Sequence, residues 1–222
     1  MDTSPTAQDP REQFDIVCVD GTPTGETKER AAVHRDGDWH RAVHVWVYGQ
    51  NESGAPCLLF QQRGLGKDTW PGRLDATVGG HLRAGEGIVE ALREVEEEIG
   101  IVTSLEQLRR LGTRIAVNES KPGLRDRELQ DVFLLRDDRP LTEFRPHPVE
   151  LAALVRFPLS DLLPLLAGET ATIAGEAFVP GAIHTTIATF VPSDFIVGVD
   201  RYFYRIVIAV GSVWRGERHV AV

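Results

Sequence analysis

The feature that most constrains the fold of this chain is a change in the spacing of its apolar residues after Glu86. Before this point, apolar residues mostly alternate with polar ones, which is the period of a β-strand with one buried face. After it, four apolar residues recur at helical spacing: Ile88, Leu92, Val95 and Ile99. This stripe predicts one helix that ends in a left-handed cap at Gly100. The glutamates expected on its opposite side are Glu90, Glu94, Glu97 and Glu98.

Strands are expected on both sides of this helix. An alternating segment that starts at Phe14 runs into Asp20-Gly21, a strong hairpin signal, and two apolar segments at 42–48 and 56–62 are joined by a turn at Asn51. The other expected elements are short segments at 75–78 and 104–111, strands at 113–117 and 128–135, and a helix at 159–166. After residue 166, strand-like and helix-like patterns are too closely mixed to separate.

The size of the chain predicts one domain with extensions. Its 222 residues, 42% of them hydrophobic, can bury a full core but are too few to favour two complete domains. Residues 1–12 are polar and contain two prolines, so we expect a mobile tail there. We expect the main domain to span residues 13–166, and residues 167–222 to form a C-terminal extension packed on it.

The charge balance excludes one large class of ligand. Acidic residues outnumber basic ones by 33 to 24, which gives a net charge of −9 and no sign of the basic face that a nucleic-acid polymer requires. An acidic protein can still bind a phosphorylated small molecule, because a divalent cation at a carboxylate cluster reverses the local sign of the charge. The expected partners are therefore a metal ion and a small molecule, and a homodimer is compatible with the sequence.

Cysteine usage and hydropathy point to the cytoplasm. The two cysteines, Cys18 and Cys57, each lie among apolar neighbours, a pattern typical of buried free thiols in a reducing compartment. The first ten residues have neither a basic nor an apolar stretch, and no later apolar run is long enough to span a bilayer. We expect neither a signal peptide nor a membrane segment.

Residues 93–101, Arg-Glu-Val-Glu-Glu-Glu-Ile-Gly-Ile, resemble the second half of the Nudix box at every defined position. The first half is present as Gly80 and Glu86 with five residues between them. The join departs from the family pattern, because one residue fewer separates Glu86 from Arg93. An isolated run of glutamates on a helix is usually only a solvated face. Here the flanking positions match as well, so the resemblance implies a hydrolase with an α/β fold, an α/β/α sandwich that has a mixed β-sheet.

The chemistry explains these residue types at this spacing. Glu94 and Glu98 are one helical turn apart and Glu97 lies beside them, so three carboxylates converge on a small volume. A hard divalent cation, Mg²⁺ or Mn²⁺, relieves their repulsion and acts on a bound phosphate. Glu94, Glu97 and Glu98 are therefore the expected metal ligands, with a backbone carbonyl at Gly79 completing the shell. Arg93 is expected to pair with a helix glutamate and hold its rotamer.

From about Phe14 to about Leu166, the chain is most similar to the isopentenyl-diphosphate isomerase-like branch of this superfamily. The segments that carry the likeness are 40–45, 62–63, 67–72, 79–81 and 123–128. In the isomerases, the corresponding positions of four residues contribute a metal site: His40, His81, Asp126 and Glu128. The essential cysteine of the isomerases falls at Gly79, and their other metal-binding histidine is at best displaced by one residue to His34. The resemblance therefore implies an isomerase-like scaffold with hydrolase chemistry.

Substrate contacts follow from the same resemblance. The residues expected to bind substrate are Arg63, Lys67, Trp70 and His81. The alternative for His40 and His81 is a hydrogen-bonding role near strand ends, and for Trp70 it is packing on the Pro-Gly turn. Trp39, Tyr202 and Phe203 are expected in the core.

The expected reaction is attack by an activated water on one phosphorus of a diphosphate. Arg93, Glu94, Glu97 and Glu128 are the expected catalytic residues, and residue type allows Glu94, Glu128 or Glu150 as the general base. Two rival functions are an isomerase of an allylic diphosphate, which the missing cysteine disfavours, and a non-catalytic nucleotide-sensing module, which the intact glutamates disfavour.

Overall fold

The computed structural model describes residues 9, 11–119, 122–196 and 198–222. Of the tail expected at residues 1–12, residues 1–8 and 10 lie outside the described residues. The strands are β1 Gln13–Val17, β2 Pro23–Glu29, β3 Trp39–Gln50, β4 Pro56–Arg63, β5 Leu74–Asp75, β6 Val78–His81, β7 Leu108–Asn118, β8 Asp126–Arg136, β9 Leu151–Pro158, β10 Ile173–Phe178 and β11 Thr186–Phe190. The helices are α1 Arg30–Asp36, α2 Ile88–Ala91, α3 Arg93–Ile99, α4 Leu159–Ala167 and α5 Tyr202–Trp214. Short 3₁₀ turns lie at Leu105–Gln107, Leu141–Glu143 and Pro192–Asp194.

All the strands belong to one mixed sheet. Its main path runs β11-β10-β9-β4-β3-β1-β2, with β5 beside β4, β6 and β8 beside β3, and β7 beside β8. Only β3 and β8 pair in parallel among the described strands, in a register that places His40 opposite Glu128. β3 meets β6 at 42–45 and β4 only at 48–50, so it contacts different neighbours along its length.

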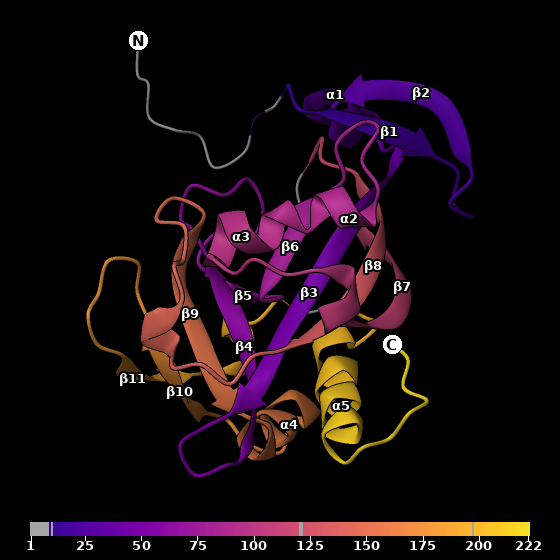
Figure 1. Ribbon diagram of the computed structural model, residues 1–222. Helices are drawn as coiled ribbons and strands as arrows, with labels where there is room; N and C mark the ends of the chain where they lie inside the picture. Colours follow the sequence, from indigo (N-terminus) through magenta and orange to yellow (C-terminus); the bar gives the residue numbers. More distant parts are fainter. Residues whose placement is uncertain (1–8, 10, 120–121, 197) are drawn as a thin grey trace.

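Helices cover both faces of the sheet, which makes the α/β/α sandwich (Figure 1). The alternation along β3 separates two cores. Val43 and Val45 pack with Val95 and Ile99 of α3, the second part of the glutamate helix α2–α3, while Trp46 points to the other face. On that second face, Trp46 belongs to a core cluster that includes apolar residues of α4 and α5, among them Leu162, Phe203, Ile206 and Val210. The sandwich with a mixed sheet is confirmed.

The glutamate helix forms where the apolar spacing predicts it. It is divided into α2 and α3 at Leu92, which keeps right-handed helical dihedrals, so the apolar stripe stays on one side. Gly100 adopts φ 73° and donates its backbone N–H to Glu96, and this left-handed cap is confirmed. The stripe buries Leu92, Val95 and Ile99 against the sheet.

Two expectations about local structure need correction. Cys18 is exposed in the turn after β1, because strand pairing stops at Val17, whereas Cys57 is buried as expected. The short strand expected at 75–78 is two pieces, β5 and β6, which pair with different neighbours. The hairpin expected at Asp20-Gly21 is confirmed, because β1 and β2 pair antiparallel on either side of this turn, although nearly all side chains of β2 are exposed.

The C-terminal residues 167–222 extend the same sheet. β10 pairs with β9, β11 pairs with β10, and α5 packs on the face that Trp46 occupies. The domain boundaries drawn at 13–166 and 167–222 remain a prediction. No helix in the described part of the chain is long and apolar enough to cross a membrane.

Candidate active site

One cavity of about 680 Å³ brings most of the predicted site residues together. Its walls come from the glutamate helix on one face of the sheet and from Tyr202 and Phe203 of α5 on the other. The predicted residues that line it are Arg63, Lys67, Trp70, Gly79, His81, Glu94, Glu97, Glu98, Asp126, Glu128 and Glu150. A cavity of this size can hold a small molecule.

Arg93 holds the glutamates of the box in place. Its guanidinium pairs with Glu94, with Glu97 one turn later at 3.1 Å, and with Glu86 at 2.9 Å. Glu86 also accepts the backbone N–H of Arg83, which ties the loop before the helix to the arginine. The shortened join between Glu86 and Arg93 therefore still allows the two to pair. The predicted pairing of Arg93 with a helix glutamate is present in the structure.

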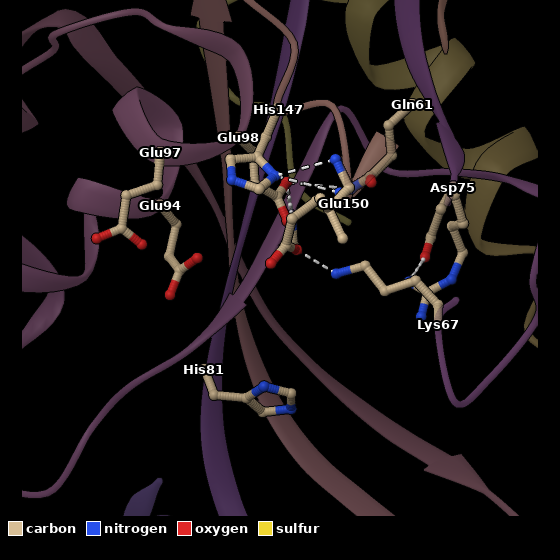
Figure 2. Close-up of polar contacts among 12 residues, drawn as sticks. Gln61, Lys67, Asp75, His81, Glu94, Glu97, Glu98, His147 and Glu150 are labelled. Atoms are coloured by element: carbon tan, nitrogen blue, oxygen red, sulfur yellow. Dashed lines mark hydrogen bonds and ion pairs between the residues drawn. The ribbon is translucent and has the colours of Figure 1, made fainter. Parts of the chain in front are cut away.

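Glu98 was expected on the side of the helix opposite the apolar stripe, but its side chain is buried. It is 3% exposed and accepts hydrogen bonds from Gln61 Nε2 at 3.2 Å and from the Gly79 N–H at 3.4 Å (Figure 2). Burial raises the pKa of Glu98 to about 8 and that of Glu94 to about 7. The cost of burial outweighs the stabilising contacts, which are Arg93 for Glu94 and Lys67 and the Gly79 N–H for Glu98. A bound cation would add the missing compensation for their negative charge.

The raised pKa values predict how the metal-free protein responds to pH. Glu94 and Glu98 release their protons near pH 4.5 when unfolded and near pH 7 and 8 when folded. Between these values the folded state binds more protons, so their contribution to the free energy of unfolding falls as pH rises. We expect Glu98→Gln to match the parent's thermal midpoint at pH 4.5 and to exceed it by pH 8 in chelator. A difference in thermal midpoint between Glu98→Gln and the parent that stayed constant from pH 4.5 to pH 8 would contradict the raised pKa of Glu98.

Two basic side chains line the cavity, Arg63 at the end of β4 and Lys67 in the loop between β4 and β5. Lys67 forms an ion pair with Glu150 (Figure 2), whose backbone N–H is in turn accepted by His147 Nδ1 at 3.2 Å. Arg63 pairs with Asp75 at 2.9 Å and donates to the carbonyl and hydroxyl oxygens of Thr69, so much of its hydrogen-bonding capacity stabilises the loop. Of the two, only Lys67 has its charge opposite a carboxylate that is itself a candidate catalytic group.

Trp70 adopts φ 50°, an unusual conformation for a bulky residue, and its partly exposed side chain lines the cavity. Tyr202 and Phe203 are buried as the core prediction requires. The same prediction is wrong for Trp39, which is only half-buried. Tyr202 and Phe203 also line the cavity, which the sequence prediction did not include.

A second cluster lies at the other end of the cavity and contains His34, His40, His81 and Asp126. One ligand atom from each of these residues lies within 4.8 Å of the others. The topology explains the gathering: α1 carries His34, β3 begins next to His40, β6 ends at His81 and β8 begins at Asp126. The ring of Phe14 stacks on His40 and His81, with centroids 5.2 and 4.8 Å away.

The donor set of this histidine cluster fits a divalent cation. In the described residues, His34 Nε2, His40 Nε2 and Asp126 Oδ1 are buried without a hydrogen-bond partner, and each nitrogen is 3.7 Å from the Asp126 oxygen. Burial lowers the pKa of His34 and of His81 to about 3, so both rings are neutral, the form that binds metal. His34 therefore joins the cluster despite its displacement in the sequence.

His81 is held from both sides. Arg30 Nη1 lies 3.0 Å from its Nδ1, and Glu128 Oε1 lies 2.8 Å from its Nε2. Because arginine can only donate, Nδ1 accepts and the proton sits on Nε2, which donates to Glu128. Ligation through Nε2 would therefore require this proton to leave. The alternative of a hydrogen-bonding role describes His81 as it stands, and Glu128 is the residue that orients it.

The sequence reasoning missed two of these polar residues, although each leaves a signal. Arg30 precedes His34 by four residues on α1 and so shares its face of the helix. Gln61 lies in the apolar strand β4, where a buried amide needs a partner, and that partner is Glu98.

Comparison with known families agrees with this arrangement. A family model described as "NUDIX domain" matches residues 38–175. The chain is 34% identical over 164 residues to "Nudix hydrolase 3" of Arabidopsis thaliana, covering 71% of this chain but only 21% of the plant protein. It is 30% identical over 153 residues to an uncharacterised Nudix hydrolase of Clostridium acetobutylicum, covering 68% of this chain and 73% of the relative.

Other similarities concern the isomerase branch and the fold. An "Isopentenyl-diphosphate Delta-isomerase" of Streptomyces avermitilis is 35% identical over 141 residues, covering 62% of this chain and 66% of that protein. The crystal structure of DR0079 from Deinococcus radiodurans matches with a TM-score of 0.53 and 22% identity, covering 71% of this chain and 90% of the other. At that identity the match bears on the fold alone.

Proposed function

Because this chain belongs to the Nudix family, we propose that it is a metal-dependent hydrolase that cleaves a diphosphate linkage in a nucleoside diphosphate derivative or similar small molecule. One observation carries the proposal: Glu94, Glu97 and Glu98 line the same cavity as the basic residues Arg63 and Lys67. Carboxylates for a cation and basic groups for phosphate oxygens are what hydrolysis of a diphosphate requires.

The roles follow from the contacts. Glu94, Glu97 and Glu98, with the backbone at Gly79, would hold Mg²⁺ or Mn²⁺, and a cation bound there would neutralise phosphate oxygens and activate a water. Arg93 fixes Glu94 and Glu97 by pairing with both. We assign substrate contacts to Arg63, Lys67 and Trp70, which line the cavity. His81 lines it too, and a substrate contact there would require its ring to give up the bond to Arg30 or to Glu128.

The general base is one of three carboxylates in the cavity: Glu94, Glu128 or Glu150. Glu128 accepts from His81 and Gln130, and Glu150 is paired with Lys67. Each is thus oriented by a neighbour, which is the usual condition of a catalytic carboxylate.

The runner-up is an isomerase of an allylic diphosphate. The histidine cluster and the relatives named isopentenyl-diphosphate Delta-isomerase favour it. Against it, Gly79 stands where the isomerase thiol is expected, and neither Cys18 nor Cys57 lines the cavity. Without a thiol, the proton transfers of isomerisation lack one acid/base group. Interconversion of isopentenyl and dimethylallyl diphosphate by the purified protein would favour this alternative.

A panel of diphosphate compounds tests the proposal. We expect release of phosphate or monophosphate from at least one compound with Mg²⁺ or Mn²⁺, complete loss in excess chelator and recovery when the cation is restored. Denatured protein is the control for contaminating phosphate. Full turnover in metal-free buffer would rule out the mechanism. If no compound were cleaved but nucleotides still bound, the non-catalytic sensing module would be favoured.

We further propose that the protein acts in the cytoplasm on a small-molecule diphosphate and binds neither a nucleic-acid polymer nor a membrane. The net charge of −9 and the two free cysteines support this. A homodimer remains a prediction.

A further inference from the structure

His44 occupies an unusual position between the core and the cavity. It lies on β3, on the same face as Trp46, and only 9% of it is exposed. Its Nδ1 is 3.2 Å from the hydroxyl oxygen of Tyr202, the first residue of α5. Trp46 Nε1 donates to the same oxygen at 2.9 Å. One hydroxyl therefore joins two residues of β3 to the C-terminal helix.

These partners fix the tautomer of His44. An indole N–H can only donate, so the Tyr202 oxygen accepts from Trp46. The hydroxyl hydrogen of Tyr202 then needs an acceptor, and within the described residues His44 Nδ1 is the only one in reach. Because Nδ1 accepts, the neutral ring carries its proton on Nε2.

The Nε2–H of His44 faces the reaction cavity. His44 lines that cavity, and its Nε2 has no hydrogen-bond partner in the part of the chain that the structure describes. A Cβ atom built on Gly79 would lie 3.4 Å from this nitrogen. Gly79 in turn donates its N–H to Glu98, so the ring is next to the backbone that supports the glutamate site. The missing side chain at Gly79 leaves the donor accessible.

We propose that His44 is a substrate-binding residue whose Nε2–H donates to an oxygen of the substrate's diphosphate group, and that Tyr202 positions it. The proposal rests on the proposed function, since it names a further contact in the same cavity. A nearly buried, neutral donor with no protein partner binds a phosphate oxygen more favourably than an exposed one, because little water has to be displaced.

Tyr202 is itself firmly held. The guanidinium of Arg114 lies 4.0 Å from the centre of its ring. Arg114 also donates to Gln130 and to Asp200, both at 2.7 Å, so it joins β7, β8 and the start of α5. This network fixes the hydroxyl that orients His44, and it gives the C-terminal segment a part in substrate binding.

Two substitutions at His44 separate a substrate contact from a structural role. An asparagine amide reaches about as far as Nδ1, so His44→Asn keeps an acceptor for Tyr202 and loses the donor in the cavity. A glutamine amide reaches about as far as Nε2, so His44→Gln keeps a donor in the cavity. Both variants and the parent are titrated with methylenediphosphonate, a non-hydrolysable diphosphate, in the presence of Mg²⁺, and their kcat and KM are measured on the compound cleaved in the panel.

We expect His44→Asn to bind methylenediphosphonate about tenfold or more weakly, as for the loss of one hydrogen bond to a charged group, and to show a matching fall in kcat/KM. His44→Gln should recover most of the parent's affinity for methylenediphosphonate and most of its kcat/KM. A merely structural role predicts the reverse order, because His44→Asn preserves the contact with Tyr202. If the parent is active and His44→Asn binds the probe and turns over substrate equally well, the assignment of His44 is overturned while the proposed function stands. A parent that neither bound the probe nor cleaved any compound would overturn both.

Tyr202→Phe tests the positioning role. It keeps the ring and removes the hydroxyl, so Nδ1 of His44 loses the donor that fixes its tautomer. In ¹⁵N spectra, His44 of the parent should show a protonated Nε2, and Tyr202→Phe should show a mixture of tautomers together with weaker binding of methylenediphosphonate. An unchanged tautomer and unchanged affinity would show that Tyr202 does not position the ring.

Discussion

Glu98→Gln is expected to lower turnover at least about a hundredfold, whereas Glu96→Gln should leave it near the parent value. Glu98 is buried at the cavity, where Gln61 and the Gly79 N–H both donate to its carboxylate. A glutamine keeps the shape of this side chain but removes the charge that a cation needs. Glu96 is exposed, two residues earlier on the same helix, and does not line the cavity.

The same pair of variants separates chemistry from folding. Without metal, Glu98→Gln should be at least as stable as the parent at neutral pH, because it removes a carboxylate that burial disfavours. Added Mg²⁺ should raise its thermal midpoint less than that of the parent. Glu96→Gln should stay within about half a kcal/mol of the parent, as for an ordinary surface site. An inactive Glu96→Gln beside a normal Glu98→Gln would show that the site residues are wrongly placed on the helix.

The sequence predicts the glutamate helix well because its determinants are local. The apolar stripe, the cap at Gly100 and the pairing of Arg93 with Glu97 all act within one or two helical turns. Burial of Glu98 is different, because the apolar stripe alone does not indicate which side chains of the sheet cover the neighbouring positions of the helix. That burial depends on Gln61, which approaches from β4, 37 residues earlier.

The second face of the sheet is the part that the sequence could not supply. The elements β10, β11 and α5 are rich in residues that suit either a strand or a helix. Their buried residues join the core cluster that contains Trp46 and Phe60, so their conformation depends on tertiary packing. The contact between His44 and Tyr202 joins positions 158 residues apart, so no local pattern announces it. Arg30 reaches His81 across 51 residues in the same way.

The histidine cluster was predicted from the resemblance to the isomerase-like branch and not from local spacing. His40, His81, Asp126 and Glu128 do gather at one end of the cavity, as the isomerase-like pattern implies. The displaced residue His34 is brought there by the first turns of α1, which begin directly after β2. A hydrogen-bonded partnership between His81 and Glu128 is the feature that the pattern did not indicate. It arises because Arg30 occupies the other nitrogen of the ring.

Gly80→Ala is expected to cut turnover at least about a hundredfold, although only one methyl group is added. A Cβ atom at Gly80 would overlap Cγ and Cδ of Glu94. These atoms are close to the backbone of α3, so Glu94 must adopt another rotamer and its carboxylate must leave its place beside Arg93. Displacing a metal ligand by about 1 Å is enough for an effect of this size. The expected signature is a lower kcat with a thermal response to Mg²⁺ that is smaller than in the parent.

Gly211→Ala provides the matched control, since it adds the same methyl group within α5, where the nearest atom is the flexible end of Arg215 at 3.4 Å. Alanine favours a helix interior over glycine, so this variant should keep full turnover and gain up to about 1 kcal/mol in stability. Gly80→Ala should also remain folded, which circular dichroism checks, because its clash involves a side chain at the edge of the cavity and not the apolar core. Normal turnover in folded Gly80→Ala would mean that the carboxylate of Glu94 is not needed where the structure places it, and Glu94 would then have to be removed from the proposed metal ligands.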